Sequence, residues 1–136
     1  MSEKVTVRPS SAAGIALDSD VHLRILVVDD DVDLCDTLAD LLVVAGCVVT
    51  TAHDGLQALR AIACSSPDVV LSDLEMPVCN GEELLRRARA HASPVPRLIL
   101  MSGTAGLAES AQRLDVDYLR KPFDLSTLLD MLRRPP

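Results

Sequence analysis

The strict alternation of apolar runs with amphipathic stretches constrains the fold of this chain more than any other feature. Five short runs rich in Val, Ile and Leu are each followed by a segment whose apolar residues recur at helical spacing. The expected strands are residues 24–28, 47–52, 68–73, 97–102 and 116–119. Parallel strands need long crossovers, and helices in those crossovers cover both faces of the sheet. The sequence therefore predicts an open α/β fold.

The domain organisation follows from where this alternation begins. Residues 1–22 mix Ser, Ala, Gly and Asp without periodicity, so we expect a flexible N-terminal extension. Residues 23–134 carry all five strand–helix units and are expected to form one domain, because 136 residues leave no room for a second core. Residues 135–136 are either the C-terminal end or the start of a linker. The chain is thus either a single-domain protein or one domain of a longer one.

Composition excludes several classes of protein. The longest apolar stretch, Leu41–Val49, is far shorter than the roughly 18 residues that span a bilayer. A net charge of −7 disfavours direct contact with nucleic acid. The four cysteines form no CxxC pair, and the N-terminus has no apolar run typical of a signal peptide. We expect a cytoplasmic protein with reduced, mostly buried cysteines and no membrane partner.

Polar and charged side chains stand at the ends of four of the five expected strands. They are Asp29, Asp30 and Asp31 after the first strand, Asp73 after the third, Ser102 after the fourth and Lys121 after the fifth. Ligands of open α/β sheets bind at the carboxyl ends of the strands, so we expect these side chains to converge. Converging carboxylates repel one another or hold a hard cation, and oxygen ligands without histidine favour Mg²⁺. The pattern predicts phosphoryl transfer to an aspartate beside Mg²⁺, a lysine and a hydroxyl.

Two other interpretations of these aspartates stay open at this point. An Asp after a strand is most often a helix N-cap or turn residue, and Asp31 and Asp33 fit that role. Asp29-x-Asp31-Val32 also fits the signature of haloacid-dehalogenase-type phosphatases, with Asp29 as nucleophile. That alternative needs a further acidic motif after the lysine, where only Asp124 and Asp130 remain.

Four segments, in order and spacing, resemble the receiver domain of two-component response regulators. They are I-L-V-V-D-D-D at 25–31, L-S-D-L-E-M-P-V-C-N-G at 71–81, L-M-S-G at 100–103 and Y-L-R-K-P-F at 118–123. The resemblance covers residues 23–134, and the four segments together are far more specific than any one of them. It implies a flavodoxin-like, or CheY-like, fold: an open five-stranded parallel sheet with strand order 2-1-3-4-5 and helices on both faces.

The resemblance also implies the roles of the site residues. Asp73 is the expected phosphoryl acceptor, which attacks the phosphohistidine of a sensor kinase or a small donor such as acetyl phosphate. The expected Mg²⁺ ligands are Asp30, Asp73, the backbone carbonyl of Glu75 and, through water, Asp29. Lys121 is expected to pair with Asp73 and then with the phosphoryl oxygens, aimed by a cis bond to Pro122.

Five further expectations concern switching and rate. Ser102 is expected to move toward the phosphoryl group and bond it, and Tyr118 to swing inward behind it, as a shift between two existing states. Gly103 leaves the site open to donor or water. Glu75 and Thr104 occupy positions where the family tunes dephosphorylation, and the sequence does not decide whether Glu75 orients or repels water.

The resemblance implies a signalling domain that catalyses its own phosphorylation and dephosphorylation, not an enzyme acting on other substrates. Its expected partners are a sensor histidine kinase or phosphotransfer protein and an output partner or attached output domain. A homodimer through the fourth helix, fifth strand and fifth helix is compatible with it. Only 18 residues separate Ser102 from Lys121, so the fourth helix is expected to be short or irregular. The alternative of a pseudo-receiver, used only for binding or dimerisation, conflicts with the filled catalytic positions.

Overall fold

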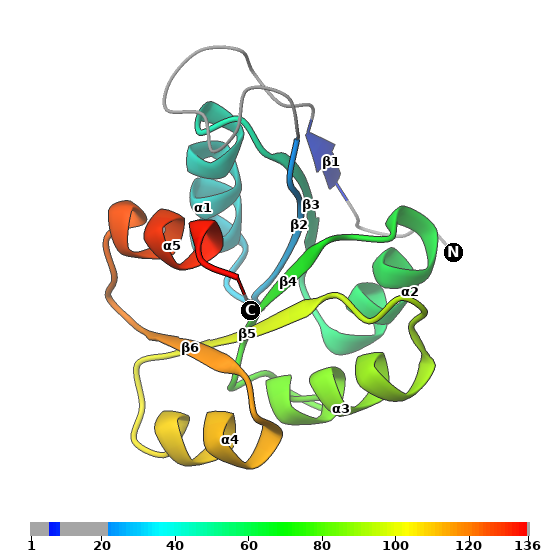
Figure 1. The fold of residues 1–136 in the computed structure, drawn as a ribbon. Coiled ribbons are helices and arrows are strands. Elements are labelled where there is room, and N and C mark those ends of the chain that lie inside the picture. The colour runs from blue at the N-terminus through cyan, green and yellow to red at the C-terminus, as the bar shows by residue number, and fades with distance from the viewer. Residues whose placement is uncertain (1–5, 9–21, 136) are drawn as a thin grey trace.

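Strands and helices alternate along the chain in the computed structural model, which describes residues 6–8 and 22–135 (Figure 1). The strands are β1 (Thr6–Arg8), β2 (Arg24–Val28), β3 (Val48–Ala52), β4 (Val69–Asp73), β5 (Arg97–Ser102) and β6 (Asp117–Arg120). The helices are α1 (Val32–Val44), α2 (Gly55–Ser65), α3 (Gly81–His91), α4 (Leu107–Leu114) and α5 (Leu125–Arg133). Each of the five expected strand–helix units is present.

The six strands form one sheet in the order β1-β3-β2-β4-β5-β6. The last five pair in parallel, which confirms the expected five-stranded sheet of order 2-1-3-4-5. β1 was not predicted; it adds an antiparallel edge strand, with Thr6 opposite Thr51. The remainder of the N-terminal extension, residues 1–5 and 9–21, lies outside the described residues, and so does its expected flexibility.

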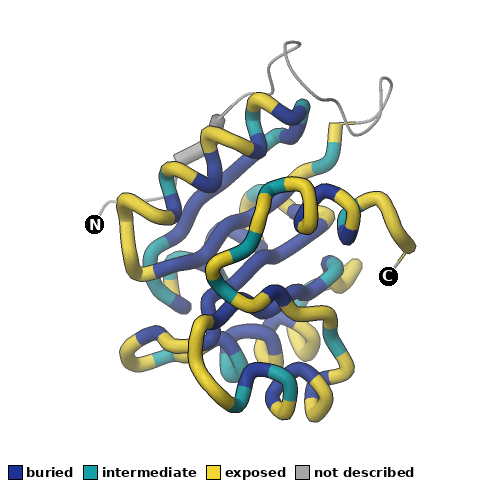
Figure 2. The backbone as a smooth tube through the Cα atoms, turned by 90° about the vertical axis from the view of Figure 1, so that its left-hand side faces the viewer, coloured by how far each residue is buried: buried dark blue, intermediate teal, exposed yellow. Residues whose placement is uncertain are grey.

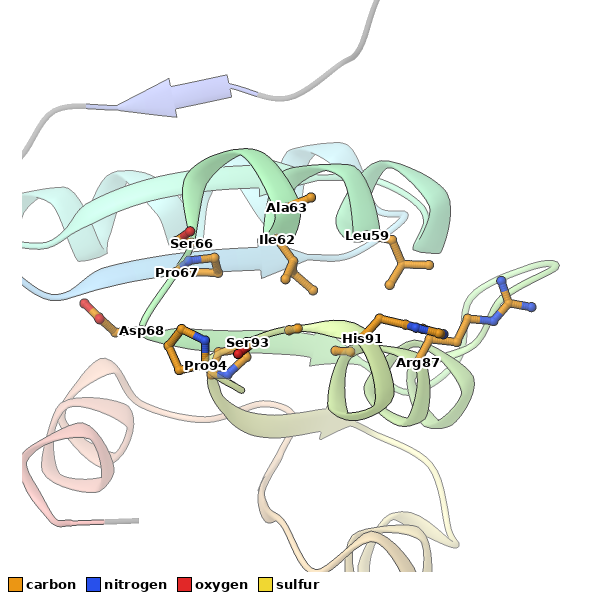
Figure 3. Close-up of a pocket in the computed structure, with 13 residues that line it drawn as sticks. Leu59, Ile62, Ala63, Ser66, Pro67, Asp68, Arg87, His91, Ser93 and Pro94 are labelled. Carbon is orange, nitrogen blue, oxygen red and sulfur yellow. The ribbon is translucent and has the colours of Figure 1, made fainter.

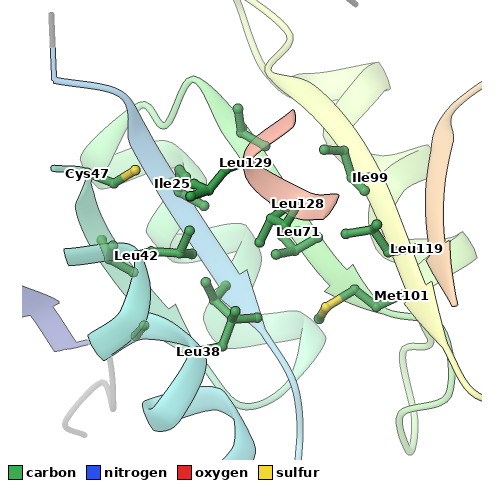
Figure 4. Packing of buried hydrophobic residues seen from close by; sticks show 14 of the residues in the cluster. Ile25, Leu38, Leu42, Cys47, Leu71, Ile99, Met101, Leu119, Leu128 and Leu129 are labelled. Atoms are coloured by element: carbon green, nitrogen blue, oxygen red, sulfur yellow. The ribbon is translucent and has the colours of Figure 1, made fainter. Parts of the chain in front are cut away.

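Side chains of the central strands alternate between two cores, one on each face of the sheet. Ile25 and Val27 of β2 belong to the core beneath α1 and α5, which Figure 4 shows in part. Leu26 and Val28 of the same strand belong to the core beneath α2, α3 and α4. Figure 2 shows the consequence, with buried strands at the centre and helices exposed on their outer sides. Burial on both faces explains why the strands are continuous apolar runs.

Capping residues mark the starts of three helices, and a glycine marks the end of α1. Asp31, Asp54 and Asn80 are the N-caps of α1, α2 and α3, and each side chain accepts a hydrogen bond from a backbone N–H of the first turn. The cap interpretation of Asp31 is therefore confirmed. Gly46 follows α1 with a φ of 101°, the left-handed conformation expected of a helix stop. α4 has only 8 residues, which confirms the expected short fourth helix.

The cysteines correct one expectation, because only half of them are buried. Cys35 and Cys47 lie in the core, whereas Cys64 is exposed and Cys79 is partly exposed; all four are free thiols. Cys64 lies on the outer side of α2, which its sequence neighbours did not reveal. None of the helices in the described part of the chain is long and apolar enough to cross a bilayer.

Candidate functional site

The candidate site lies at the carboxyl ends of the parallel strands. Asp73 and Ser102 are the last residues of β4 and β5, Asp29 directly follows β2, and Lys121 directly follows β6. Strand register brings these ends level, since Asp73 pairs with Met101 and Ser102 pairs with the last residue of β6. The N–H of Lys121 donates to the carbonyl of Ser102 at 2.8 Å, which extends the pairing into the site.

Three carboxylates converge at this edge. One ligand oxygen from each of Asp29, Asp30 and Asp73 lies within 4.8 Å of the others. Asp29 and Asp73 are buried, whereas Asp30 is exposed. Three oxygen ligands at this separation, one of them from an exposed residue, fit Mg²⁺. Mg²⁺ prefers oxygen ligands and usually keeps several water molecules in its coordination shell. The donor set therefore fits the expected magnesium.

Lys121 is a cation shared by two of the three carboxylates. Its Nζ donates to Asp29 Oδ2 at 2.8 Å and to Asp73 Oδ1 at 3.2 Å. The other oxygen of Asp29 accepts from the N–H of Asp31 at 3.0 Å, so both oxygens of this buried carboxylate are engaged. The Lys121–Pro122 peptide bond is cis, as the resemblance implied.

Burial and charge shift the pKa values of Asp73 and Lys121. Burial, reinforced by the charge of Asp29, raises the pKa of Asp73 to about 6, although Lys121 opposes the rise. For Lys121, burial lowers the pKa, but the hydrogen bonds and charges of Asp29 and Asp73 outweigh burial and leave it raised. At neutral pH the site therefore holds an ionised carboxylate of raised basicity against a fully charged ammonium.

A second group of side chains surrounds Ser102, which is fully buried. The Ser102 hydroxyl donates to Glu75 Oε1 at 2.7 Å, and the Thr104 hydroxyl donates to Glu75 Oε2 at 2.8 Å. The two hydroxyl oxygens are 2.8 Å apart, and the N–H of Thr104 donates to Ser102 Oγ at 3.0 Å. Both oxygens of Glu75 are thus held by hydroxyl groups, an arrangement that sequence reasoning missed because it depends on the path of two loops.

The remaining predicted residues lie at the margin of the site. Tyr118 lies on β6 with its residue surface 42% exposed, so its side chain is on the outside in this structure. Gly103 is exposed, and a Cβ added there would meet only Lys121 atoms, at 3.7 Å. The inward swing of Tyr118 and the tuning roles of Gly103, Glu75 and Thr104 stay predictions.

Gly81 is a supporting residue to which sequence reasoning assigned no role. A Cβ at this position would overlap the backbone carbonyl of Asp73 and would lie 2.9 Å from the Cα of Leu74. Its N–H donates to the carbonyl of Leu74 at 2.9 Å, which closes the loop after β4. The Asn80-Gly81 pair at the start of a helix was the available signal. Glycine here lets α3 begin directly against the backbone of Asp73.

A pocket between α2 and α3 lies elsewhere and shares no residue with the site (Figure 3). It includes Pro67 and Asp68, just before β4, and Ser93 and Pro94, before β5. These residues lie at the amino ends of the strands, the edge of the sheet opposite to Asp73. The pocket therefore takes no part in the carboxylate site.

The doubly wound parallel sheet with an acidic group and a lysine at its carboxyl edge defines a flavodoxin-like protein of the CheY-like class. The family described as "Response regulator receiver domain" matches residues 25–133, inside the domain expected at 23–134. This chain belongs to that family.

Relatives and solved structures agree with the family assignment. Response regulator MprA of Mycobacterium ulcerans is 40% identical over 116 residues, 83% of this chain and 50% of the relative. MprA of Mycobacterium tuberculosis strain H37Rv gives the same identity and coverage. The chain thus spans about half the length of these curated relatives.

Two solved structures carry the same fold. Chemotaxis response regulator CheY4 of Vibrio cholerae superposes with a TM-score of 0.75 at 28% identity, covering 84% of this chain and 98% of that one. A receiver domain from Bermanella marisrubri gives a TM-score of 0.75 at 31% identity, covering 82% and 96%. The fold and the family are thereby established.

Proposed function

We propose that this chain is a phospho-accepting receiver domain of a two-component system, with Asp73 as the acceptor. The observation that carries the proposal is the pair of hydrogen bonds from Lys121 Nζ to Asp29 and Asp73, at the edge where three carboxylates converge. A structural ion pair needs one carboxylate, whereas this lysine joins two that belong to a potential cation site.

The reaction is a displacement at phosphorus. A carboxylate oxygen of Asp73 attacks the phosphorus of a phosphohistidine or of acetyl phosphate and forms an acyl phosphate. The P–N bond of phosphohistidine, or the P–O bond of acetyl phosphate, breaks, and imidazole or acetate leaves with the electron pair. The imidazole leaving group takes up one proton from solvent, acetate leaves as the anion, and neither reaction needs a redox partner.

The residues around Asp73 have separate roles in that displacement. The ammonium of Lys121 lies 3.2 Å from Asp73 Oδ1 before the reaction. As the phosphoryl group is transferred, this ammonium would pair with the phosphoryl oxygens. Asp30, Asp73 and the backbone carbonyl of Glu75 would hold Mg²⁺ directly, and Asp29 would hold it through water. When bound, Mg²⁺ supplies a divalent positive charge that offsets the charge of the transferring oxygens. Ser102 would donate to a phosphoryl oxygen, and Tyr118 would move inward behind it.

The proposed output is a conformational change at the surface that a partner protein recognises. We infer that a sensor histidine kinase or phosphotransfer protein supplies the phosphoryl group, and that α4, β6 and α5 present the altered face to a second copy or an output partner. The net charge of −7 of the whole chain disfavours direct binding to nucleic acid. The same assignment makes the chain a cytoplasmic signalling domain that acts on its own aspartate.

The phosphatase alternative has no support at its second aspartate. Asp31 Oδ1 accepts from the N–H of Leu34 at 3.2 Å as the N-cap of α1, which leaves it in a structural role. Its proposed nucleophile, Asp29, has both oxygens engaged. A pseudo-receiver would accept no phosphoryl group, so labelling with acetyl phosphate separates this alternative from the proposal.

Intact mass measured after incubation with acetyl phosphate and Mg²⁺ tests the proposal. We expect a single phosphoryl adduct on the parent that hydroxylamine removes, as for an acyl phosphate, and no adduct on Asp73→Asn. Asp29→Asn controls for the loss of a neighbouring carboxylate and retains the acceptor. Absence of the adduct from the parent, with a known receiver labelled in parallel and a phosphohistidine donor also tried, would contradict the proposal.

A further inference from the structure

The Ser102 hydroxyl already donates its one hydrogen in a hydrogen bond in this structure. This hydrogen is donated to Glu75 Oε1 at 2.7 Å, and Thr104 donates its own hydroxyl hydrogen to Glu75 Oε2 at 2.8 Å. Ser102 Oγ in turn accepts the N–H of Thr104 at 3.0 Å. Ser102 is fully buried, so these protein groups provide the hydrogen bonds that water would otherwise make.

The hydroxyl groups of Ser102 and Thr104 have only two hydrogens to donate between them. A hydroxyl has one hydrogen to donate, and an ionised carboxylate can only accept. Two hydroxyl hydrogens serve the three short contacts among Ser102, Thr104 and Glu75, and both point to the carboxylate when it is ionised. A phosphoryl group also only accepts. Ser102 therefore cannot donate to a phosphoryl oxygen on Asp73 while it donates to Glu75.

We propose that Glu75 is a positioning residue that holds the Ser102 hydroxyl in its resting place, directly and through Thr104, and that phosphorylation of Asp73 must break this hold. We call the three side chains Glu75, Ser102 and Thr104 the hydroxyl latch. This inference rests on the proposed function, and it assigns Glu75 a task in the unphosphorylated protein in addition to any effect on dephosphorylation.

The latch joins the loop after β4 to the loop after β5. Glu75 follows β4 by two residues, and Thr104 follows β5 by two residues. Arg120 of β6 also donates to the carbonyl of Thr104, at 3.2 Å, so the loop that leads to α4 is held from both sides. A phosphoryl group on Asp73 adds negative charge close to the carboxylate of Glu75 and offers Ser102 a competing acceptor. Both effects favour the released state.

The test compares variants that separate the hydrogen bonds of Glu75 from its charge. Glu75→Ala removes both and keeps the backbone carbonyl that is expected at Mg²⁺. Glu75→Gln removes the charge and keeps one acceptor for Ser102 and one donor for Thr104. Glu109→Gln, at an exposed position in the first turn of α4, controls for net charge. The rate of adduct formation from acetyl phosphate is followed by intact mass at fixed Mg²⁺.

We expect Glu75→Ala to be phosphorylated about three- to tenfold faster than the parent, which corresponds to roughly 0.7–1.4 kcal/mol, the range of a net hydrogen bond. Glu75→Gln loses the repulsion but keeps the hydrogen bonds, so it should be accelerated less than Glu75→Ala, and Glu109→Gln should stay within about twofold of the parent. If Glu75→Gln is as fast as Glu75→Ala, charge alone sets the rate and the latch is refuted. Equal rates for all variants would refute it as well.

A second measurement does not require phosphorylation. Because the N–H of Thr104 is bonded to Ser102 Oγ, its hydrogen exchange reports on the latch in the resting protein. We expect exchange about tenfold faster in Glu75→Ala and nearly unchanged in Glu75→Gln, in the absence of donor and Mg²⁺. If the parent accepts no phosphoryl group, the proposed function fails and exchange alone decides the latch. Unchanged exchange in Glu75→Ala would overturn it.

Discussion

The buried acceptor carboxylate should make the domain less stable as pH rises, and Asp73→Asn should remove that dependence. Folding raises the pKa of Asp73 from 3.8 to about 6, chiefly through burial. Between these values the folded protein holds a proton that the unfolded chain has lost, so the free energy of unfolding falls as pH rises. Asparagine resembles the protonated acid and has no proton to lose in this range.

The magnitude follows from the size of the shift. A difference of about 2 pKa units, at 1.36 kcal/mol each, gives about 3 kcal/mol. This value already includes the opposing attraction of Lys121, which is among the causes of the shift. Relative to the parent, Asp73→Asn should therefore gain about 3 kcal/mol of stability between pH 4 and pH 7. Above pH 7 the advantage should be constant.

Urea unfolding followed by helical circular dichroism measures the effect, because the chain has no Trp and a single Tyr. Parent and variant are compared in EDTA at several pH values, with Asp33→Asn as the control. Asp33 is an exposed aspartate in the first turn of α1, so its removal changes net charge equally. Saturating Mg²⁺ should restore stability to the parent, by about 2.7 kcal/mol at one hundred times its dissociation constant, and should not do so for Asp73→Asn.

A difference between parent and Asp73→Asn that is flat with pH would refute this reasoning. The same slope in Asp33→Asn would assign the dependence to net charge instead of to burial of the acceptor. Indifference of the parent to millimolar Mg²⁺ would argue that the three carboxylates do not form a cation site.

Three other substitutions test the support of the site and the core. Gly81→Ala should destabilise the fold and slow adduct formation, because its Cβ overlaps the backbone carbonyl of the acceptor, whereas Gly103→Ala, with no contact closer than 3.7 Å, should fold normally; thermal melts and intact mass compare them. Lys121→Met should cost about 2 kcal/mol or more in EDTA at neutral pH, because it leaves two buried carboxylates without their cation, and Lys121→Arg should recover most of the loss. Leu71→Ala, at a position 1% exposed, should cost about 2–5 kcal/mol in urea unfolding, against about 0.5 kcal/mol for Leu41→Ala, which is 43% exposed.

The sheet was predictable because each strand is buried on both faces. The expected run 97–102 coincides with β5, and the expected run 47–52 differs from β3 by one residue at its start. Continuous burial makes such runs visible in one sequence, and N-caps such as Asp54 mark the helices between them. β1 was missed because three residues carry no usable periodicity, and their pairing depends on the free edge of β3.

The gathering of the carboxylates was also predictable, since parallel topology places every strand end at one edge. Asp29 and Asp73 lie 44 positions apart in the sequence, yet one lysine bonds both. The partner of Ser102 was not predictable. It depends on how the loops after β4 and β5 pass each other, and sequence placed Glu75 only as the second residue beyond the acceptor.

The charge of the site would couple the proposed phosphorylation of Asp73, the proposed metal binding and the proposed latch. Three aspartates and Lys121 carry a net charge of −2 when ionised, which one Mg²⁺ would neutralise. Replacing the carboxylate charge of Asp73 by a phosphoryl dianion takes the group to −3 without the metal and to −1 with it. The remaining negative charge arises next to the carboxylate of Glu75, which already raises the pKa of Asp73. The residue that holds Ser102 is therefore the one that the new charge repels, so the electrostatics of phosphorylation and the release of the hydroxyl favour the same state.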